Sequence, residues 1–146
     1  ISSQAIELAK INAKNNGVSD VIDFKVGDLF EPFPKNRKGK GKKQFNLIAS
    51  NPPYIKSDSL TTLMREVREH EPMIALDGGI DGLDFYKRII DDAHSYLKSG
   101  GLLLLEIGYD QGQRVPELIR ERGYYGEPRV FKDLAGHDRL VLVEAK

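Results

Sequence analysis

The sequence predicts an α/β fold built around a largely parallel sheet. Segments with helical periodicity alternate with short apolar segments typical of strands. Residues 102–107 (LLLLEI) are apolar on both faces, as buried parallel strands are. Only a short connection separates the strand-like residues 129–131 from residues 140–143, which favours an antiparallel pair at the C-terminal end.

The N-terminal third predicts one helix and two strands. Ser2 or Ser3 can cap the helix, and Gly17 stands where the helix would end. Residues 21–26 alternate between apolar and polar side chains, which predicts a strand. Residues 45–50 (FNLIAS) form a short apolar run between turn residues, which predicts a buried strand.

Three further helices are predicted by apolar residues at helical spacing. The first covers residues 60–67 and is stopped by Pro72. A stronger pattern covers residues 86–97 and is followed by two glycines. The last helix lies around residues 115–119, and Gly123 follows its end.

Composition narrows the class of protein. The chain has 146 residues, and 22 Lys and Arg balance 22 Asp and Glu, so a strongly basic nucleic-acid coat is excluded. With 40% hydrophobic and 30% charged residues the chain is expected to fold. It has no cysteine, so disulfides and thiolate sites are excluded. The three histidines lack metal-ligand spacing, and we expect no metal site.

The sequence shows neither a bilayer-length apolar run nor a signal peptide, so we expect a cytoplasmic protein without a membrane partner. It predicts no particular oligomeric state. Residues 35–43 carry six Lys and Arg, typical of a solvated loop. The alternative for this basic loop is a contact surface for RNA or an acidic partner, although no aromatic residues are interleaved with the charges.

Polar residues follow three of the predicted strands. Gly27-Asp28-Leu29-Phe30 follows residues 21–26, Asn51-Pro52-Pro53-Tyr54 follows residues 45–50, and Glu106 ends the leucine-rich strand. Ligands of open parallel sheets bind outside the carboxyl ends of the strands. We therefore expect these residues to line a functional site.

The Asn-Pro-Pro-Tyr segment is the most informative of the three. Its prolines fix two φ angles and remove two N–H donors, which makes a stiff turn. Asn51 and the Pro52 carbonyl offer acceptors, and Tyr54 offers a flat ring, so together they can hold a planar group that carries an NH₂. The alternative is an ordinary strand exit, where Pro and Asn are common.

Asp28 and Glu106 each allow two interpretations. Asp28 is either a cap of a helix or turn, or an acceptor for the amino group of a purine with Leu29 or Phe30 against the ring. Glu106 lies either behind the site or facing the substrate, and in both cases a buried carboxylate requires hydrogen bonds.

These residues resemble a known family. Asn51-Pro52-Pro53-Tyr54 is similar to the motif of class I S-adenosylmethionine-dependent methyltransferases that act on planar amino nitrogens. Further segments resemble the HemK/PrmC family of protein-(glutamine N(5)) methyltransferases that act on peptide-chain release factors. These segments are His70-Glu71-Pro72, Ala75-Leu76, Gly78-Gly79, Asp81-Gly82-Leu83, Glu106-Ile107-Gly108 and Asp133-Leu134-Ala135-Gly136-His137-Asp138-Arg139.

The resemblance implies a Rossmann-like class I methyltransferase fold, truncated at the N-terminus. The family's glycine-rich loop and acidic ribose-binding residue are expected before Ile1, together with the first two strands. Residues 1–146 would then be a partial methyltransferase domain. The cofactor implied is S-adenosyl-L-methionine, with Asp28, Leu29 and Asn51 as binding residues.

The activity implied is methyl transfer to a glutamine side-chain nitrogen of a release factor. Asn51, Pro52, Pro53 and Tyr54 would bind that glutamine, with Asn51, Pro52 and Tyr54 as the catalytic set. Two alternative substrates remain open, an amino group of RNA or DNA and a glutamine of a ribosomal protein. Zero net charge makes a nucleic acid the less favoured substrate. A different class of function is a non-catalytic interaction module.

Overall fold

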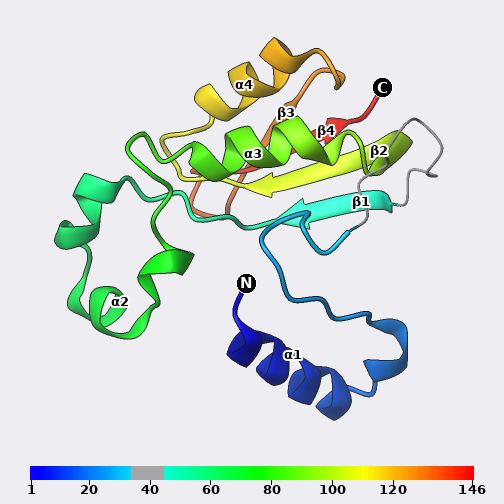
Figure 1. Cartoon of the computed structure of the whole chain (residues 1–146). Helices are drawn as coiled ribbons and strands as arrows, with labels where there is room; N and C mark the ends of the chain where they lie inside the picture. Colours follow the sequence, from blue (N-terminus) through cyan, green and yellow to red (C-terminus); the bar gives the residue numbers. More distant parts are fainter. Residues whose placement is uncertain (34–44) are drawn as a thin grey trace. The chain divides into compact units, whose positions relative to one another are not determined.

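A computed structural model describes residues 1–33 and 45–146 of the chain. The chain divides into two compact units, Ile1–Lys40 and Gly41–Lys146 (Figure 1). The predicted basic loop at residues 35–43 lies outside the described residues. The interpretation of residues 1–146 as one partial domain stays a prediction.

The first unit contains the predicted N-terminal helix, α1 (Ser3–Asn15). The Ser2 hydroxyl accepts a hydrogen bond from the N–H of Ala5 over 3.2 Å and so caps its start. Gly17 follows its end with a φ of 68°, a conformation that favours glycine. The strand predicted at residues 21–26 is wrong. A short 3₁₀ helix covers Ser19–Val21, and residues 22–33 belong to no strand.

The second unit is built on a sheet of four strands in the order β1-β2-β4-β3. These strands are β1 (Phe45–Ser50), β2 (Leu97–Glu106), β3 (Arg129–Lys132) and β4 (Asp138–Glu144). β1 and β2 are parallel, whereas β4 pairs antiparallel with both β2 and β3. The predicted α/β class and the antiparallel pair at the C-terminal end are therefore confirmed.

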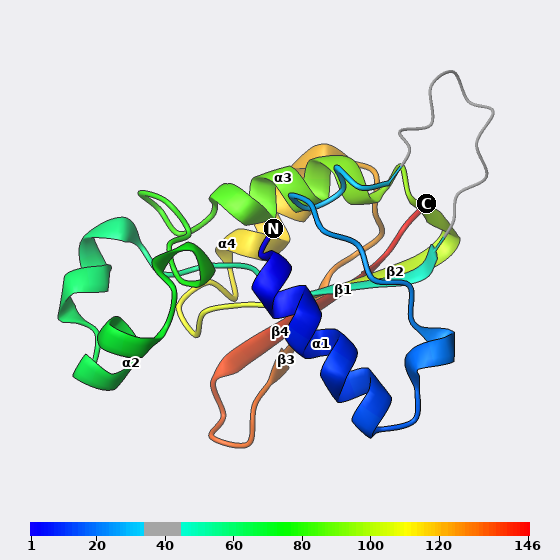
Figure 2. The same ribbon diagram turned by 60° about the horizontal axis from the view of Figure 1, so that its bottom comes forward.

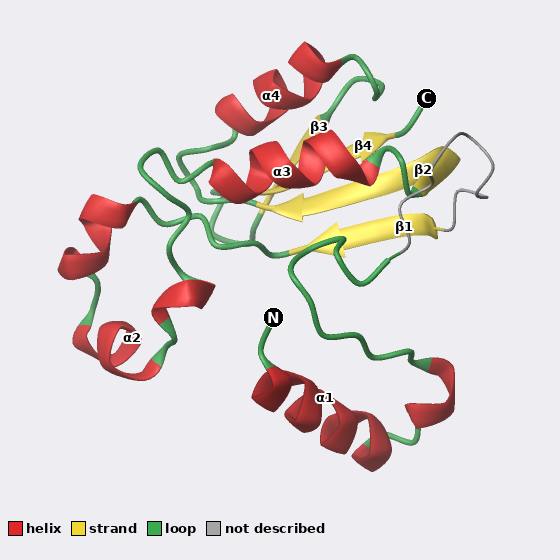
Figure 3. Ribbon diagram, viewed as in Figure 1, coloured by secondary structure: helices red, strands yellow, loops and turns green. Residues whose placement is uncertain are grey.

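Helices α3 (Asp84–Ala93) and α4 (Arg114–Arg122) cover one face of this sheet (Figure 3). Alternate residues of β2 and β4 on that face are fully buried, and the buried apolar side chains of the two helices complete the core. Its largest members are Tyr86, Ile89, Ile90, Leu103, Leu105, Ile119, Val141 and Val143. This apolar layer holds the strand ends in place, because burial of such side chains is the main term that favours folding.

The opposite face is less covered than the sequence predicts. Leu102 and Leu104 are only half-buried, and Leu47 of β1 is 51% exposed. Among the described strands β1 has a partner on one side only, so it forms an edge of the sheet.

Two helix predictions are wrong in their extent. The pattern over residues 60–67 corresponds to two short pieces, a 3₁₀ helix at Ser57–Thr62 and α2 (Arg65–His70). α3 ends at Ala93, and Leu97, which continues the helical spacing, instead begins β2. We name residues 57–76, which project from the end of β1, the α2 lobe (Figure 2).

Candidate functional site

The Asn-Pro-Pro-Tyr segment forms a corner directly after β1. Asn51 is exposed, Pro52 is buried, and Pro53 and Tyr54 are half-buried. Ser50 pairs with Leu105 of β2, so Asn51 and Glu106 follow neighbouring positions on adjacent parallel strands. The four predicted acceptor-binding residues, which are consecutive in the chain, thus follow the carboxyl end of β1, and Asn51 among them is exposed.

Backbone hydrogen bonds fix the exit of this corner. The N–H of Ile55 donates to the carbonyl of Leu76 over 3.0 Å, and the N–H of Gly78 donates to the carbonyl of Ile55 over 2.8 Å. A Cβ on Gly78 would lie 2.8 Å from the Cα of Tyr54, closer than real contacts allow. The glycine therefore permits the following loop to pack on the backbone of the corner.

Gln111 holds the corner from the other side. Its side chain is buried, with 4% of the residue exposed. Its Nε2 donates to the carbonyls of Tyr54 and Gly82, over 3.3 and 3.0 Å, and its Oε1 accepts from the N–H of Gly108 over 2.9 Å. One amide thereby satisfies polar groups of three loops. Sequence reasoning missed this residue, because the bonded segments lie 29 and 57 positions away along the chain.

A carboxylate strengthens the same exit. The hydroxyl of Ser57 donates to Asp77 Oδ1 over 2.7 Å, and the N–H of Gly79 donates to the same oxygen over 2.9 Å. These bonds lower the pKa of the Asp77 carboxyl below its ordinary value, and the bond from Ser57 has the larger effect. The charged form is therefore the one that joins residue 57 to the glycine loop.

Glu106 is placed through its backbone. The hydroxyl of Tyr86, which is fully buried in α3, donates to the Glu106 carbonyl over 2.8 Å. Burial is the main reason why the pKa of the Tyr86 hydroxyl is raised. Glu106 is half-buried, and it follows Leu105, the residue that pairs with Ser50 just before Asn51. The end of β2 is therefore anchored on the helix layer.

The other predicted cofactor-binding residues lie in the first unit. Asp28 and Leu29 are half-buried, and Glu31 closes their turn by donating its N–H to the Asp28 carbonyl over 2.9 Å. Leu29 has a φ of 49°, a left-handed conformation that is costly for a branched apolar residue. In kind, these residues fit an adenine, since a carboxylate can accept from its amino group and an apolar side chain can cover its ring.

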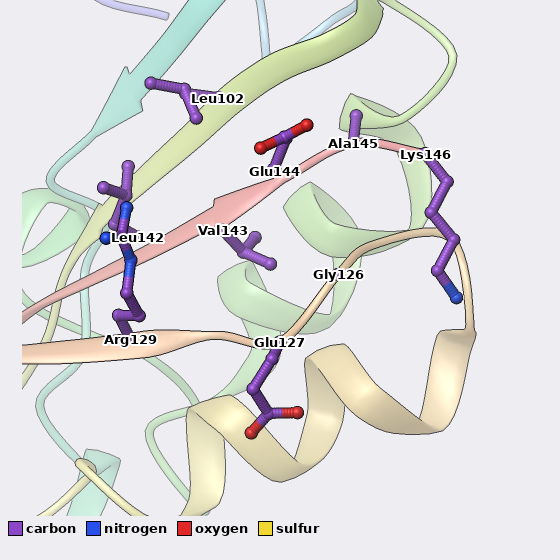
Figure 4. Close-up of a pocket in the computed structure, with 9 residues that line it drawn as sticks. All are labelled: Leu102, Gly126, Glu127, Arg129, Leu142, Val143, Glu144, Ala145 and Lys146. Atoms are coloured by element: carbon purple, nitrogen blue, oxygen red, sulfur yellow. The ribbon is translucent and has the colours of Figure 1, made fainter.

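A pocket of about 430 Å³ lies elsewhere in the second unit (Figure 4). It is lined by Leu102, Gly126, Glu127, Arg129, Leu142, Val143, Glu144, Ala145 and Lys146. Leu102 and Glu144 form one end of the β2–β4 ladder, and Glu106 pairs with Leu140 at its other end. The pocket is thus at the other end of the sheet from the Asn51 corner, and it shares none of the predicted site residues.

Within residues 1–33 and 45–146, no three His, Asp or Glu side chains are grouped so that they could hold a metal ion. None of the helices described there has the length and apolar character needed to cross a lipid bilayer.

The chain is similar to known proteins in sequence and in fold. No family model matches the sequence. The release factor glutamine methyltransferase of Thermodesulfovibrio yellowstonii is 40% identical over 143 residues, 98% of this chain and 48% of that protein. The protein of the same name from Caulobacter vibrioides is 44% identical over 141 residues, 97% of this chain and 46% of that protein.

The fold has a counterpart among solved structures. The crystal structure of a methyltransferase from Pyrococcus furiosus superposes with a TM-score of 0.60 at 18% identity, covering 100% of this chain and 59% of that one. At this identity the similarity concerns the fold alone. The chain spans about half the length of the curated relatives it matches. The chain is therefore similar, over nearly its whole length, to about half of each of these release factor glutamine methyltransferases.

Proposed function

We propose that the whole protein transfers a methyl group to the side-chain amide nitrogen of a glutamine in a peptide-chain release factor. This chain would supply the corner that binds the glutamine. The observation that carries the proposal is the exposed Asn51 on a clamped, proline-rich corner at the carboxyl end of β1. The names of the relatives support the choice of a glutamine over other amino groups.

The corner offers two acceptors to the glutamine amide. The Asn51 side-chain oxygen and the Pro52 carbonyl would each accept one N–H of the glutamine NH₂, while Pro53 and the Tyr54 ring pack on its plane. An amide nitrogen is a poor nucleophile because its lone pair is delocalised. Acceptors fixed in advance favour the pyramidal nitrogen of the transition state, and the stiff backbone avoids reorganisation during the reaction.

The methyl donor in this proposal is S-adenosyl-L-methionine. When bound, it would supply an electrophilic methyl group on a sulfonium whose bonding pair stays on sulfur. Asp28 would accept from the adenine amino group, Leu29 would cover the ring, and Asn51 would lie near the methionine part. The glutamine nitrogen becomes cationic as the new bond forms, and it then releases its proton to water. A separate general base is therefore not required.

The test uses the full-length protein, its release factor and S-adenosylmethionine with a labelled methyl group. We expect the label on a glutamine, located by peptide mass spectrometry. Asn51→Ala should lower kcat by about 100-fold or more while stability changes by about 0.5 kcal/mol or less. The matched control is Asn46→Ala, since Asn46 is also exposed and lies near the start of β1, where its Oδ1 accepts from Lys98 Nζ.

Each rival function predicts a different result. Label on RNA or DNA, with binding that weakens steeply as salt rises, would indicate a nucleic-acid substrate. Label on a ribosomal protein would keep the chemistry and change the partner. If the full-length protein does not bind S-adenosylhomocysteine in calorimetry, the non-catalytic module is favoured.

Because release factors act during translation, the proposed reaction belongs in the cytoplasm.

A further inference from the structure

The turn between β3 and β4 is fixed by one carboxylate. Asp133 Oδ1 accepts from the N–H groups of Ala135 and His137, over 2.9 and 3.0 Å. Its Oδ2 accepts from Nε and Nη2 of Arg139, both over 3.3 Å. This clasp joins the start of the turn to its end, so the residues between them are held in one shape.

The clasp is also tied to the end of β2. Arg139 Nη1 donates to the carbonyl of Ile107 over 3.2 Å, and the N–H of Ile107 donates to the carbonyl of Arg139 over 2.9 Å. Ile107 directly follows Glu106. Glu106 and Asn51 are each the residue after the Leu105–Ser50 pair of the sheet. Both ribbon views show this turn and the α2 lobe projecting from the same end of the sheet (Figures 1 and 2). The turn is therefore anchored at the end that carries the Asn51 corner.

Several apolar side chains near this end of the sheet are exposed to solvent. Leu134 at the tip of the turn is fully exposed, and Tyr109 is 69% exposed. The His137 ring lies 6.0 Å from the Tyr109 ring, centroid to centroid. We name Tyr109, Leu134 and His137 the turn surface. The α2 lobe and the loop after it add exposed Met64, Ile74 and Ile80. A single exposed leucine is ordinary, but exposed apolar side chains on both the turn and the α2 lobe, which project from the same end of the sheet, favour a contact surface there.

The charges of the turn favour an apolar partner over a nucleic acid. Lys132 Nζ pairs with Asp138 over 2.7 Å, and Arg139 pairs with Asp133 over 3.3 Å. The cations beside Leu134 are thus engaged by carboxylates of the same turn. A nucleic acid is bound mainly through cations that neutralise phosphates. A partner with apolar side chains gains burial here without breaking either pair.

We propose that the turn surface contacts apolar side chains that flank the acceptor glutamine in the polypeptide substrate, with Leu134 as a specificity-determining residue. The inference rests on the proposed function and goes beyond it by assigning a second contact outside the glutamine corner. A substrate protein reaches both the corner and the turn surface, whereas a short glutamine peptide reaches only the corner.

The test compares Leu134→Asp with wild type in the full-length protein. With the intact release factor we expect KM to rise about tenfold or more and kcat to stay within about twofold. Thermal unfolding should be unchanged, because Leu134 makes no buried contact to lose. Leu134→Met should keep the wild-type KM. Ser99→Asp is the matched control, since it adds the same charge at an exposed position near the other end of β2.

Two results would overturn the inference while the proposed function stands. One is an unchanged KM of Leu134→Asp for the intact release factor. The other is an equal loss with a short glutamine peptide, which would place Leu134 at the corner itself. If wild type does not methylate the release factor, the proposed function fails. Direct calorimetric binding of the release factor then decides the turn surface, with weaker binding by Leu134→Asp supporting it and equal binding overturning it.

Discussion

The side-chain amide of Gln111 donates to the backbone carbonyl of Tyr54 over 3.3 Å, and so joins the loop after β2 to the corner after β1. The same nitrogen donates to Gly82, and the amide oxygen accepts from Gly108. Because Gln111 is buried, the polar groups that it satisfies have poor access to water. The position of the corner therefore depends on one side chain outside the Asn-Pro-Pro-Tyr motif.

Gln111→Leu should lower the free energy of unfolding by about 1–3 kcal/mol, because it leaves buried backbone groups without partners. Urea denaturation measures the change. Gln113→Leu is the matched control. Gln113 lies two positions further on, is exposed, and bonds Glu117 over 3.0 Å, so its loss should cost about 0.5 kcal/mol or less. Equal costs for the two variants would contradict the role of Gln111.

Gly82→Ala should cost more than Gly123→Ala, although both glycines have a positive φ, 73° and 69°. A Cβ on Gly82 would lie 2.5 Å from the Tyr54 carbonyl oxygen, whereas one on Gly123 would meet no described atom within 4 Å. Gly123→Ala isolates the backbone strain, about 1 kcal/mol. The clash at Gly82 should add about 1–3 kcal/mol.

Thermal unfolding of both glycine variants provides the comparison. If the two melting temperatures fall by the same amount, the close approach of the Gly82 loop to the corner is refuted. If the proposed function holds, Gly82→Ala should also lower kcat, because the loop would displace the Tyr54 carbonyl, while Gly123→Ala should leave kcat unchanged.

Tyr86→Phe should lower the free energy of unfolding at neutral pH by about 0.5–1.5 kcal/mol through loss of the bond to the Glu106 carbonyl. Its pH dependence should also change. The folded state raises the pKa of the Tyr86 hydroxyl, chiefly by burial, so it binds that proton more tightly than the unfolded chain does. This contribution is complete below the unfolded pKa of about 10 and is lost as the pH rises above it.

Wild type should therefore lose more stability than Tyr86→Phe between neutral pH and the range above about pH 10. Urea denaturation at both pH values measures the difference. Tyr124→Phe is the control, since Tyr124 is 46% exposed and its hydroxyl faces no comparable burial. The same alkaline loss in wild type and Tyr86→Phe would show that burial does not hold this proton.

Several elements could be predicted because their signals are local. β1 occupies the expected residues 45–50, since turn residues bound a short apolar run on both sides. α4 ends where Gly123 adopts a left-handed φ of 69°. The antiparallel pair β3 and β4 follows from a connection too short for a crossover.

The errors occurred where a pattern has more than one structural solution. Residues 21–26 alternate as a strand does, but alternation shows only which face could be buried and not whether a neighbouring strand exists to bond it. Leu97 continues the helical spacing of residues 86–93, and it is equally suited to a buried start of β2. The segment before Pro72 forms two short helices instead of one continuous helix. Its helical periodicity is weak, and tertiary packing contributes more to helix stability than such a local pattern does.

The sequence by itself determined the stiff corner at residues 51–54, because proline rings restrict φ through bonds to their own neighbours. Its motifs, spread along most of the chain, also indicated the resemblance to the relatives that the chain matches at 40% identity. Only the tertiary structure decided what holds the corner, namely Gln111 and the close glycines, and where the clasped turn of Asp133 and Arg139 projects. Those contacts join segments far apart in the chain, so they exist only once the strands have set the path of the backbone.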